Sequence, residues 1–127
     1  MGKDKLFHVG KYKPLYNKLL NLSLPCNNIF RSNGLSKHIL KRHPQCIAYI
    51  DNIPEIISNP DYIGTNPREK NSVEFIKCYS ENILVAVKLD IQKNYYYVAS
   101  VYDITNSKLT RRINSNRCIK FTIDNNP

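Results

Sequence analysis

The fold is decided by two stretches in the second half of the chain, residues 82–90, which read NILVAVKLD, and residues 95–104, which read YYYVASVYDI. Along the first stretch, odd-numbered side chains point to one side of an extended strand and even-numbered ones, including Lys88, to the other. The second stretch is rich in Tyr and Val, which favour strands. Residues 72–79 have a weaker strand pattern, and Asn94 lies where a turn is needed. These segments predict an antiparallel meander.

Before residue 70 the chain reads as short helical segments separated by Pro and Asn. Pro14 can begin a helix that runs to Leu20, and residues 35–43 predict a helix that ends before Pro44. Helices first and strands afterwards predict an α+β domain, with N-terminal short helices packed on a roughly four-stranded antiparallel β-sheet. The weaker expected elements are strands at Leu6–Tyr12, Cys26–Arg31 and Ile119–Ile123, a helix at Glu55–Ser58 and a loop over Tyr62–Asn71.

Length and composition bound the class of protein. A chain of 127 residues predicts a single domain, 1–127. The longest apolar stretch has the length of a strand and the first ten residues lack an apolar signal core, so we expect a cytoplasmic protein without a signal peptide or membrane partner. The four cysteines form no CxxC pair, and we expect reduced, mostly buried thiols. With four glycines, no glycine-rich cofactor loop is expected, and we predict no cofactor.

The net charge of +9 is unevenly distributed. Residues 1–50 hold nine basic and one acidic side chain, residues 51–100 five and seven, and residues 101–127 five and two. If the fold brings the two ends together, they form a positive face that attracts polyanions such as nucleic acids. The alternative is that the charge serves only solubility.

Residues 38–43, HILKRH, are the strongest candidates for catalysis. Histidine moves protons near neutral pH, and Arg42 follows His38 by four residues, so both point the same way from a helix. A histidine beside a guanidinium suits phosphodiester cleavage, in which one group moves a proton and the other stabilises charge growing on phosphorus. The alternatives are a core histidine at His43 and a surface histidine at His38. Zinc held by both histidines and Cys46 lacks a fourth ligand, so we predict no metal site.

A second constellation follows the aromatic strand, in residues 105–112, TNSKLTRR. Its hydroxyl and cationic side chains suit phosphate oxygens, unless the segment is only a solvated basic hairpin. Tyrosines 95, 96, 97 and 102 either stack on bases or pack in the core. Lys88, beside Ser100 or Tyr102 of the neighbouring strand, either lines a cleft or extends along apolar surface.

Four segments, at residues 34–44, 53–64, 82–90 and 95–104, together resemble the phage-associated nuclease domains grouped with barnase, EndoU, colicin tRNases and RelE, the BECR superfamily. The resemblance covers a core of about residues 33–112, leaving a basic N-terminal extension, 1–32, and a C-terminal strand and tail, 113–127. It implies N-terminal helices on a four-stranded antiparallel sheet. It also implies metal-independent RNA cleavage to a 2′,3′-cyclic phosphate and a 5′-hydroxyl.

We therefore predict a toxin-like endoribonuclease. Its substrate would be RNA, with tRNA as one candidate, and its partner an acidic immunity or antitoxin protein. The alternative is a nucleic-acid-binding module without catalysis, which would be favoured if the two histidines do not converge with a cation. The expected catalytic residues are His38, Arg42, His43 and Lys108, and the expected substrate-binding residues are Lys41, Lys88, Ser100, Tyr102, Ser107, Arg111 and Arg112.

Overall fold

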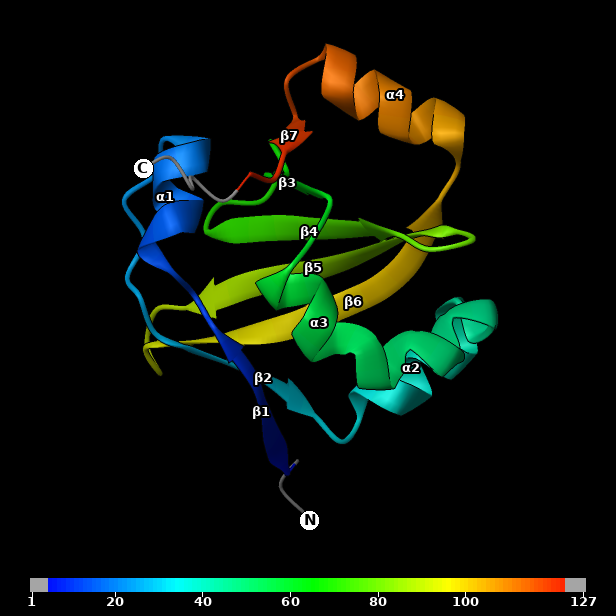
Figure 1. Cartoon of the computed structure of the whole chain (residues 1–127). Helices are drawn as coiled ribbons and strands as arrows, with labels where there is room; N and C mark the ends of the chain where they lie inside the picture. Colours follow the sequence, from blue (N-terminus) through cyan, green and yellow to red (C-terminus); the bar gives the residue numbers. More distant parts are fainter. Residues whose placement is uncertain (1–4, 123–127) are drawn as a thin grey trace.

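The computed structural model describes residues 5–122, so the ends of the expected domain and of the last expected strand, at Ile123, lie outside it. The chain forms one sheet with helices on both faces (Figure 1). The elements are β1 (Leu6–Lys11), α1 (Pro14–Leu20), β2 (Asn28–Ser32), α2 (Leu35–Arg42), the 3₁₀ helix η1 (Pro44–Asn52), α3 (Ile53–Ser58), β3 (Tyr62–Gly64), β4 (Ser72–Cys78), β5 (Asn82–Asp90), β6 (Tyr95–Ile104), α4 (Asn106–Asn114) and β7 (Cys118–Lys120). None of the helices in this part of the chain is long and apolar enough to cross a membrane.

The sheet has seven strands in the order β1-β2-β6-β5-β4-β3-β7. The expected meander of β4, β5 and β6 is confirmed and forms its centre, with Phe75, Val85 and Val101 in register. The prediction of a roughly four-stranded antiparallel sheet is wrong, because short strands extend both edges and β2 runs parallel to β6. These strands form because the main-chain N–H and C=O groups at the edges of the meander need partners.

The prediction that helices come first is also wrong, since the weak strands expected at Leu6–Tyr12 and Cys26–Arg31 are confirmed as β1 and β2, which pair with each other. The segment expected to be a loop contains β3, which lies between β4 and β7. Three residues carry too little alternation to predict a strand from sequence. Helix α1 begins at Pro14, α2 ends before Pro44, and α3 has Pro54 in its first turn, which confirms the helices predicted at these prolines.

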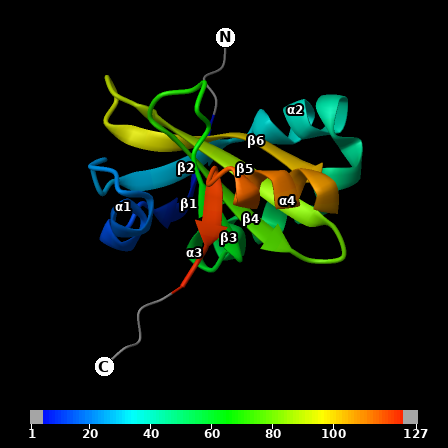
Figure 2. The ribbon, with the colours of Figure 1, turned by 90° about the horizontal axis from the view of Figure 1, so that it is seen from above.

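The two faces of the sheet have different covers. On one face, which we call the core face, Phe75, Val85 and Val101 pack with buried side chains of α2 and α3 such as Ile39 and Ile56. On the other, the polar face, α4 packs Leu109 against a smaller cluster from β4 and β5. Figure 2, seen from above, shows α4 over these strands. The remainder of the polar face has no helix over it within the described residues.

Three tyrosines hold α1 to the core face. Tyr12 and Tyr96 stack with ring centroids 4.8 Å apart, and Tyr16 meets Tyr12 edge-on at 5.2 Å. The Tyr16 hydroxyl donates to the Ile57 carbonyl at 2.7 Å, and burial raises the pKa of Tyr16 to about 12. All three rings are fully buried. Tyr96 is therefore a core residue, whereas its neighbours Tyr95 and Tyr97 lie on the polar face.

The basic segment 105–112 forms helix α4 and not a hairpin. The Thr105 hydroxyl accepts a hydrogen bond from the Lys108 backbone N–H at 3.1 Å, which caps the first turn. Leu109 and Ile113, four residues apart, give the helix an apolar side that packs on the sheet. The cap and the spacing are both local, so this helix could have been predicted from the sequence.

Replacing Gly64 with alanine is expected to destabilise the fold. A Cβ at this position of β3 would lie 2.2 Å from the Arg117 carbonyl oxygen and 2.8 Å from the Cys118 Cβ. Backbone would have to move, and overpacking of this kind costs about 2–3 kcal/mol. Urea unfolding measures the loss. The matched control is Gly10→Ala, whose Cβ would meet only the Ile57 side chain, at 3.3 Å. Equal losses in the two variants would contradict this account of the β3–β7 contact.

Candidate active site

Both candidate histidines lie along one edge of β6. Strand β2 pairs with β6 only at Tyr96 and Tyr97, and beyond these positions α2 packs beside the strand. There the His38 Nε2 lies 3.4 Å from the Ser100 Oγ. The helix therefore brings a histidine to a serine 62 residues away in the chain.

His43 reaches the same strand two residues further on. Its backbone N–H donates to the Ile39 carbonyl at 2.7 Å, which closes α2, and Pro44 prevents the helix from continuing. The ring then lies over Tyr102, with centroids 5.4 Å apart and planes inclined by 32°. Ser100 and Tyr102 both lie on the polar face of the sheet. The two histidines, which contact them, therefore approach β6 from the same face.

A β-bulge in β6 sets this arrangement. The pairs Val87–Val98 and Ala86–Ser100 leave Ala99 without a partner on β5. A bulge of this kind re-aims the side chains that follow it. Here Val98 and Val101 both remain in the core cluster, while Ser100 turns to the polar face.

Asp103, whose side chain points to the core face of β6, binds the first residues of η1. Its carboxylate accepts from the Gln45 amide at 2.8 Å and from the Cys46 thiol at 3.7 Å. The Gln45 hydrogen bond is the main cause that lowers the pKa of Asp103, and burial raises the pKa of Cys46 to about 11. Because His43 directly precedes η1, these contacts also fix the histidine. Cys46 is a core thiol; Cys118 is also buried, but Cys26 and Cys78 are exposed, contrary to expectation.

The cations of α2 are exposed and unpaired within residues 5–122. Neither Lys41 nor Arg42 has a side-chain hydrogen bond or ion pair in this part of the chain. Arg42 follows His38 by one helical turn, so the two side chains share a side of α2. The site therefore combines two histidines with a guanidinium that is available to an anion.

Helix α4 carries a second basic group of side chains. They line a hollow of about 490 Å³ whose walls are Lys108, Arg111, Arg112, Ser115 and Arg117. Tyr102 packs against the cluster that contains Leu109 and thereby connects this helix to the histidine strand. Ser107 is exposed in the first turn, outside the hollow.

Two of these arginines are held by a buried carboxylate. Glu74 of β4, whose side chain is 3% exposed, accepts from Arg112 at 2.6 Å and from Arg117 at 3.1 Å. The clamp fixes α4 and the segment before β7 on the polar face. It also neutralises part of the charge, so Lys108 and Arg111 are the cations of the hollow that remain available.

Lys88 does not join either group, since its ammonium is paired with Glu69. This hydrogen bond is the main cause that raises the pKa of Lys88. The sheet also does not gather the basic ends of the chain, because β1 and β7 form opposite edges. Among residues 5–122, no three His, Cys, Asp or Glu side chains are grouped to hold a metal ion.

The residues that sequence analysis missed are Glu74, Gln45, Asp103 and Arg117. A signal existed for Glu74: a carboxylate lies among the apolar side chains of residues 73–76 in an expected strand. Such a group is rarely buried without a cationic partner. No local pattern indicates the other three, whose roles depend on the sheet.

The site thus combines two histidines and the exposed cations of α2 beside β6 of an α+β fold. The family model of phage-Barnase-EndoU-ColicinE5/D-RelE-like nuclease 3 matches residues 7–111, and the chain belongs to this family of phage-associated nucleases. No curated protein and no solved structure matches the chain. Membership in the family implies a nucleic-acid substrate.

Substituting Glu74 with glutamine is expected to lower the free energy of unfolding by about 3 kcal/mol, because removing one partner of a buried ion pair leaves the others uncompensated. The change keeps the side-chain volume, so lost charge is the cause. Urea unfolding gives the value. Glu69→Gln is the control: its pair with Lys88 is 42% and 35% exposed, and such surface pairs contribute less than about 1 kcal/mol. A loss at Glu74 no larger than that at Glu69 would refute the clamp.

Proposed function

We propose that the chain is an endoribonuclease that cleaves RNA without a metal ion, by attack of the 2′-hydroxyl on the adjacent phosphate. The observation that carries the proposal is the approach of His38 and His43 to the same side of β6, beside Ser100 and Tyr102. Two histidines close to one strand supply the acid and the base that this reaction needs. Arg42 supplies the positive charge.

In the proposed reaction, His38 is the base. When its Nε2 is unprotonated it accepts a hydrogen bond from Ser100, and this is the form that can remove the 2′-hydroxyl proton. The 2′-oxygen then bonds to phosphorus and the bond from phosphorus to the 5′-oxygen breaks. His43 gives a proton to that oxygen. The products are a 2′,3′-cyclic phosphate and a 5′-hydroxyl.

The cations stabilise the transition state and bind the substrate. Arg42 neutralises the charge that grows on the phosphate oxygens in the transition state, and Lys41 adds to the field around it. Lys108 and Arg111 bind other phosphates of the same RNA chain, and the Ser107 hydroxyl can donate a hydrogen bond to one of them. We also propose that an acidic immunity or antitoxin protein controls the enzyme by covering these cations.

Incubating the protein with tRNA and with a single-stranded RNA in excess EDTA tests the reaction. We expect cleavage that leaves cyclic phosphate ends. His38→Ala and His43→Ala should each lower the rate by about 10²–10⁴-fold, the usual contribution of a general acid or base.

His8→Ala is the matched control, because His8 lies in β1, near the edge of the sheet, where it contacts Asn28 and Phe30. Its rate should equal that of the unsubstituted protein. Cleavage that requires a divalent ion, or that survives both histidine substitutions, would overturn the proposed mechanism.

A second candidate function is nucleic-acid binding without cleavage. The basic hollow of α4 favours it, since its lining residues do not include the histidines. In this case a folded protein would bind RNA in a salt-dependent way and leave it intact.

Salt dependence measures the phosphate contacts under either function. For an RNA with 2′-O-methyl groups, which the proposed reaction cannot cleave, Lys108→Ala and Arg111→Ala should each reduce the slope of log K against log salt by about 1. Lys77→Ala is the control, because the Lys77 ammonium donates to the Asn59 carbonyl at 2.8 Å. A slope that stays unchanged in the α4 variants would exclude these side chains as phosphate contacts.

A further inference from the structure

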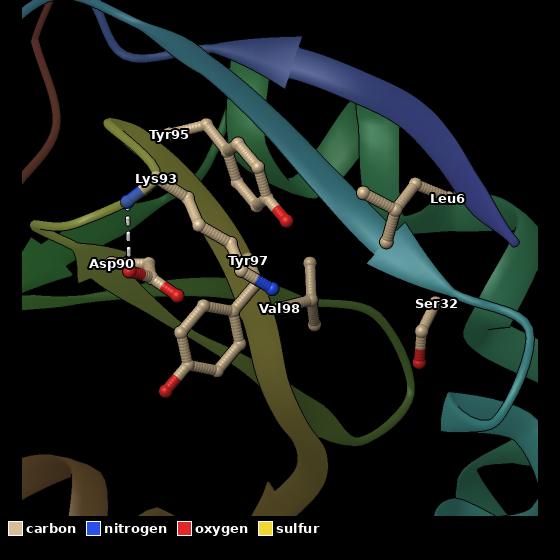
Figure 3. Close-up of a pocket in the computed structure, with 7 residues that line it drawn as sticks. All are labelled: Leu6, Ser32, Asp90, Lys93, Tyr95, Tyr97 and Val98. Carbon is tan, nitrogen blue, oxygen red and sulfur yellow. Dashed lines mark hydrogen bonds between the residues drawn. The ribbon is translucent and has the colours of Figure 1, made fainter. Parts of the chain in front are cut away.

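One hollow of the structure lies outside the histidine site. It is an open hollow of about 680 Å³ between β1, the end of β2 and the first half of β6. Figure 3 shows its lining, which includes Leu6, Asp90, Lys93, Tyr95 and Tyr97. A volume in this range is typical of sites that bind ligands with the size of a nucleotide.

Two aromatic rings face this hollow. Tyr97 is 37% exposed, although its neighbour Tyr96 is fully buried, so the core does not need the Tyr97 ring. Tyr95 is held in place by Phe30, whose ring meets it edge-on at 5.2 Å. The Tyr95 ring is thus positioned by a neighbouring ring, while the Tyr97 ring remains partly exposed to a ligand.

The hollow has one acidic and one basic side chain in its lining, Asp90 and Lys93. Asp90 accepts a hydrogen bond from the Lys93 backbone N–H at 3.1 Å, which shapes the turn after β5. The Lys93 side chain extends between the two tyrosine rings in the view of Figure 3. Its ammonium has no partner within residues 5–122. A cation beside exposed aromatic rings suits a ligand with a flat base and a phosphate.

The hollow adjoins the proposed active site on the same face of the sheet. Tyr97 is paired with Lys88 of β5, and Ser100 is paired with Ala86. Two residues along β5 correspond to about 7 Å at the usual rise of a strand. A nucleic-acid strand that places its scissile phosphate at Ser100 therefore brings a neighbouring nucleotide to Tyr97.

We propose that this hollow is a base-stacking subsite, which holds an unpaired nucleobase next to the cleaved phosphate and restricts the enzyme to single-stranded RNA. The inference rests on the proposed function for the position of the scissile phosphate. The Tyr97 ring stacks on the base, Tyr95 borders it, and Lys93 contacts a phosphate. Within a duplex, the adjacent base pairs stack on both faces of each base, so the internal bases of duplex RNA cannot stack on the ring.

The absence of tryptophan from the sequence allows a direct test. Tyr97→Trp places a single tryptophan in the subsite, and a stacked base quenches its fluorescence. The probe is a single-stranded 2′-O-methyl oligonucleotide, compared with a duplex of the same sequence. We expect saturable quenching by the single strand and little by the duplex.

Phe7→Trp is the matched control, because Phe7 is 40% exposed and belongs to the opposite face of β1, where Arg31 lies over its ring. It should not be quenched. In affinity measurements by anisotropy, Tyr97→Ala should weaken single-strand binding by about 5- to 150-fold, which corresponds to the 1–3 kcal/mol of one stacked base. Tyr97→Phe should retain binding, because the ring remains.

Cleavage of natural RNA by the unsubstituted protein is measured in parallel. If the RNA is cleaved but Tyr97→Trp is not quenched, or is quenched equally by the duplex, the subsite is overturned and the reaction stands. If quenching is specific for the single strand but no RNA is cleaved, the stacking site is supported and the proposed reaction is overturned. Unchanged affinity in Tyr97→Ala would also refute the subsite.

Discussion

The arrangement of the whole site depends on the unequal pairing of β6. One side of this strand pairs with β5 along its full length, whereas the other side pairs with β2 at two positions only. The rest of that edge would expose main-chain groups, and α2 and η1 pack beside it instead. Because a helix replaces a strand at this edge, side chains of α2 reach the polar face from the side. A longer β2 would have kept His38 and His43 away from Ser100 and Tyr102.

The charge of the molecule is partly consumed by its own structure. Glu74 holds Arg112 and Arg117, and Glu69 holds Lys88. The net charge of +9 therefore overstates what a nucleic acid can meet in any one place. Within residues 5–122, the cations near Ser100 and Tyr102 that have no ion pair include Lys41 and Arg42 on α2 and Lys108 and Arg111 on α4. Since α4 directly follows β6, these two groups lie at the two sides of the strand that carries Ser100 and Tyr102.

The sequence predicts what local patterns determine. The strand over residues 95–104 is predicted from its Tyr and Val content, and the end of α2 before Pro44 is predicted from the proline; both are confirmed. The width of the sheet could not be predicted, because β3 and β7 are three residues long and exist only through their pairing. Glu74 is separated in sequence from Arg112 by 38 positions and from Arg117 by 43, and no local pattern indicates that these side chains meet. The candidate residues of α2 and β6 could be proposed from their types, but the contact between His38 and Ser100 depends on the tertiary fold.

Stability and the proposed chemistry use different faces of the same sheet. The core face buries the large apolar cluster and the three stacked tyrosines, so it supplies most of the hydrophobic free energy. The polar face needs only the smaller cluster under α4, which fixes that helix and leaves the region of Tyr97 and Ser100 uncovered. Side chains in that region can therefore hold a ligand without being required for folding. This division explains how a chain of 127 residues can expose aromatic and titratable groups together on one strand.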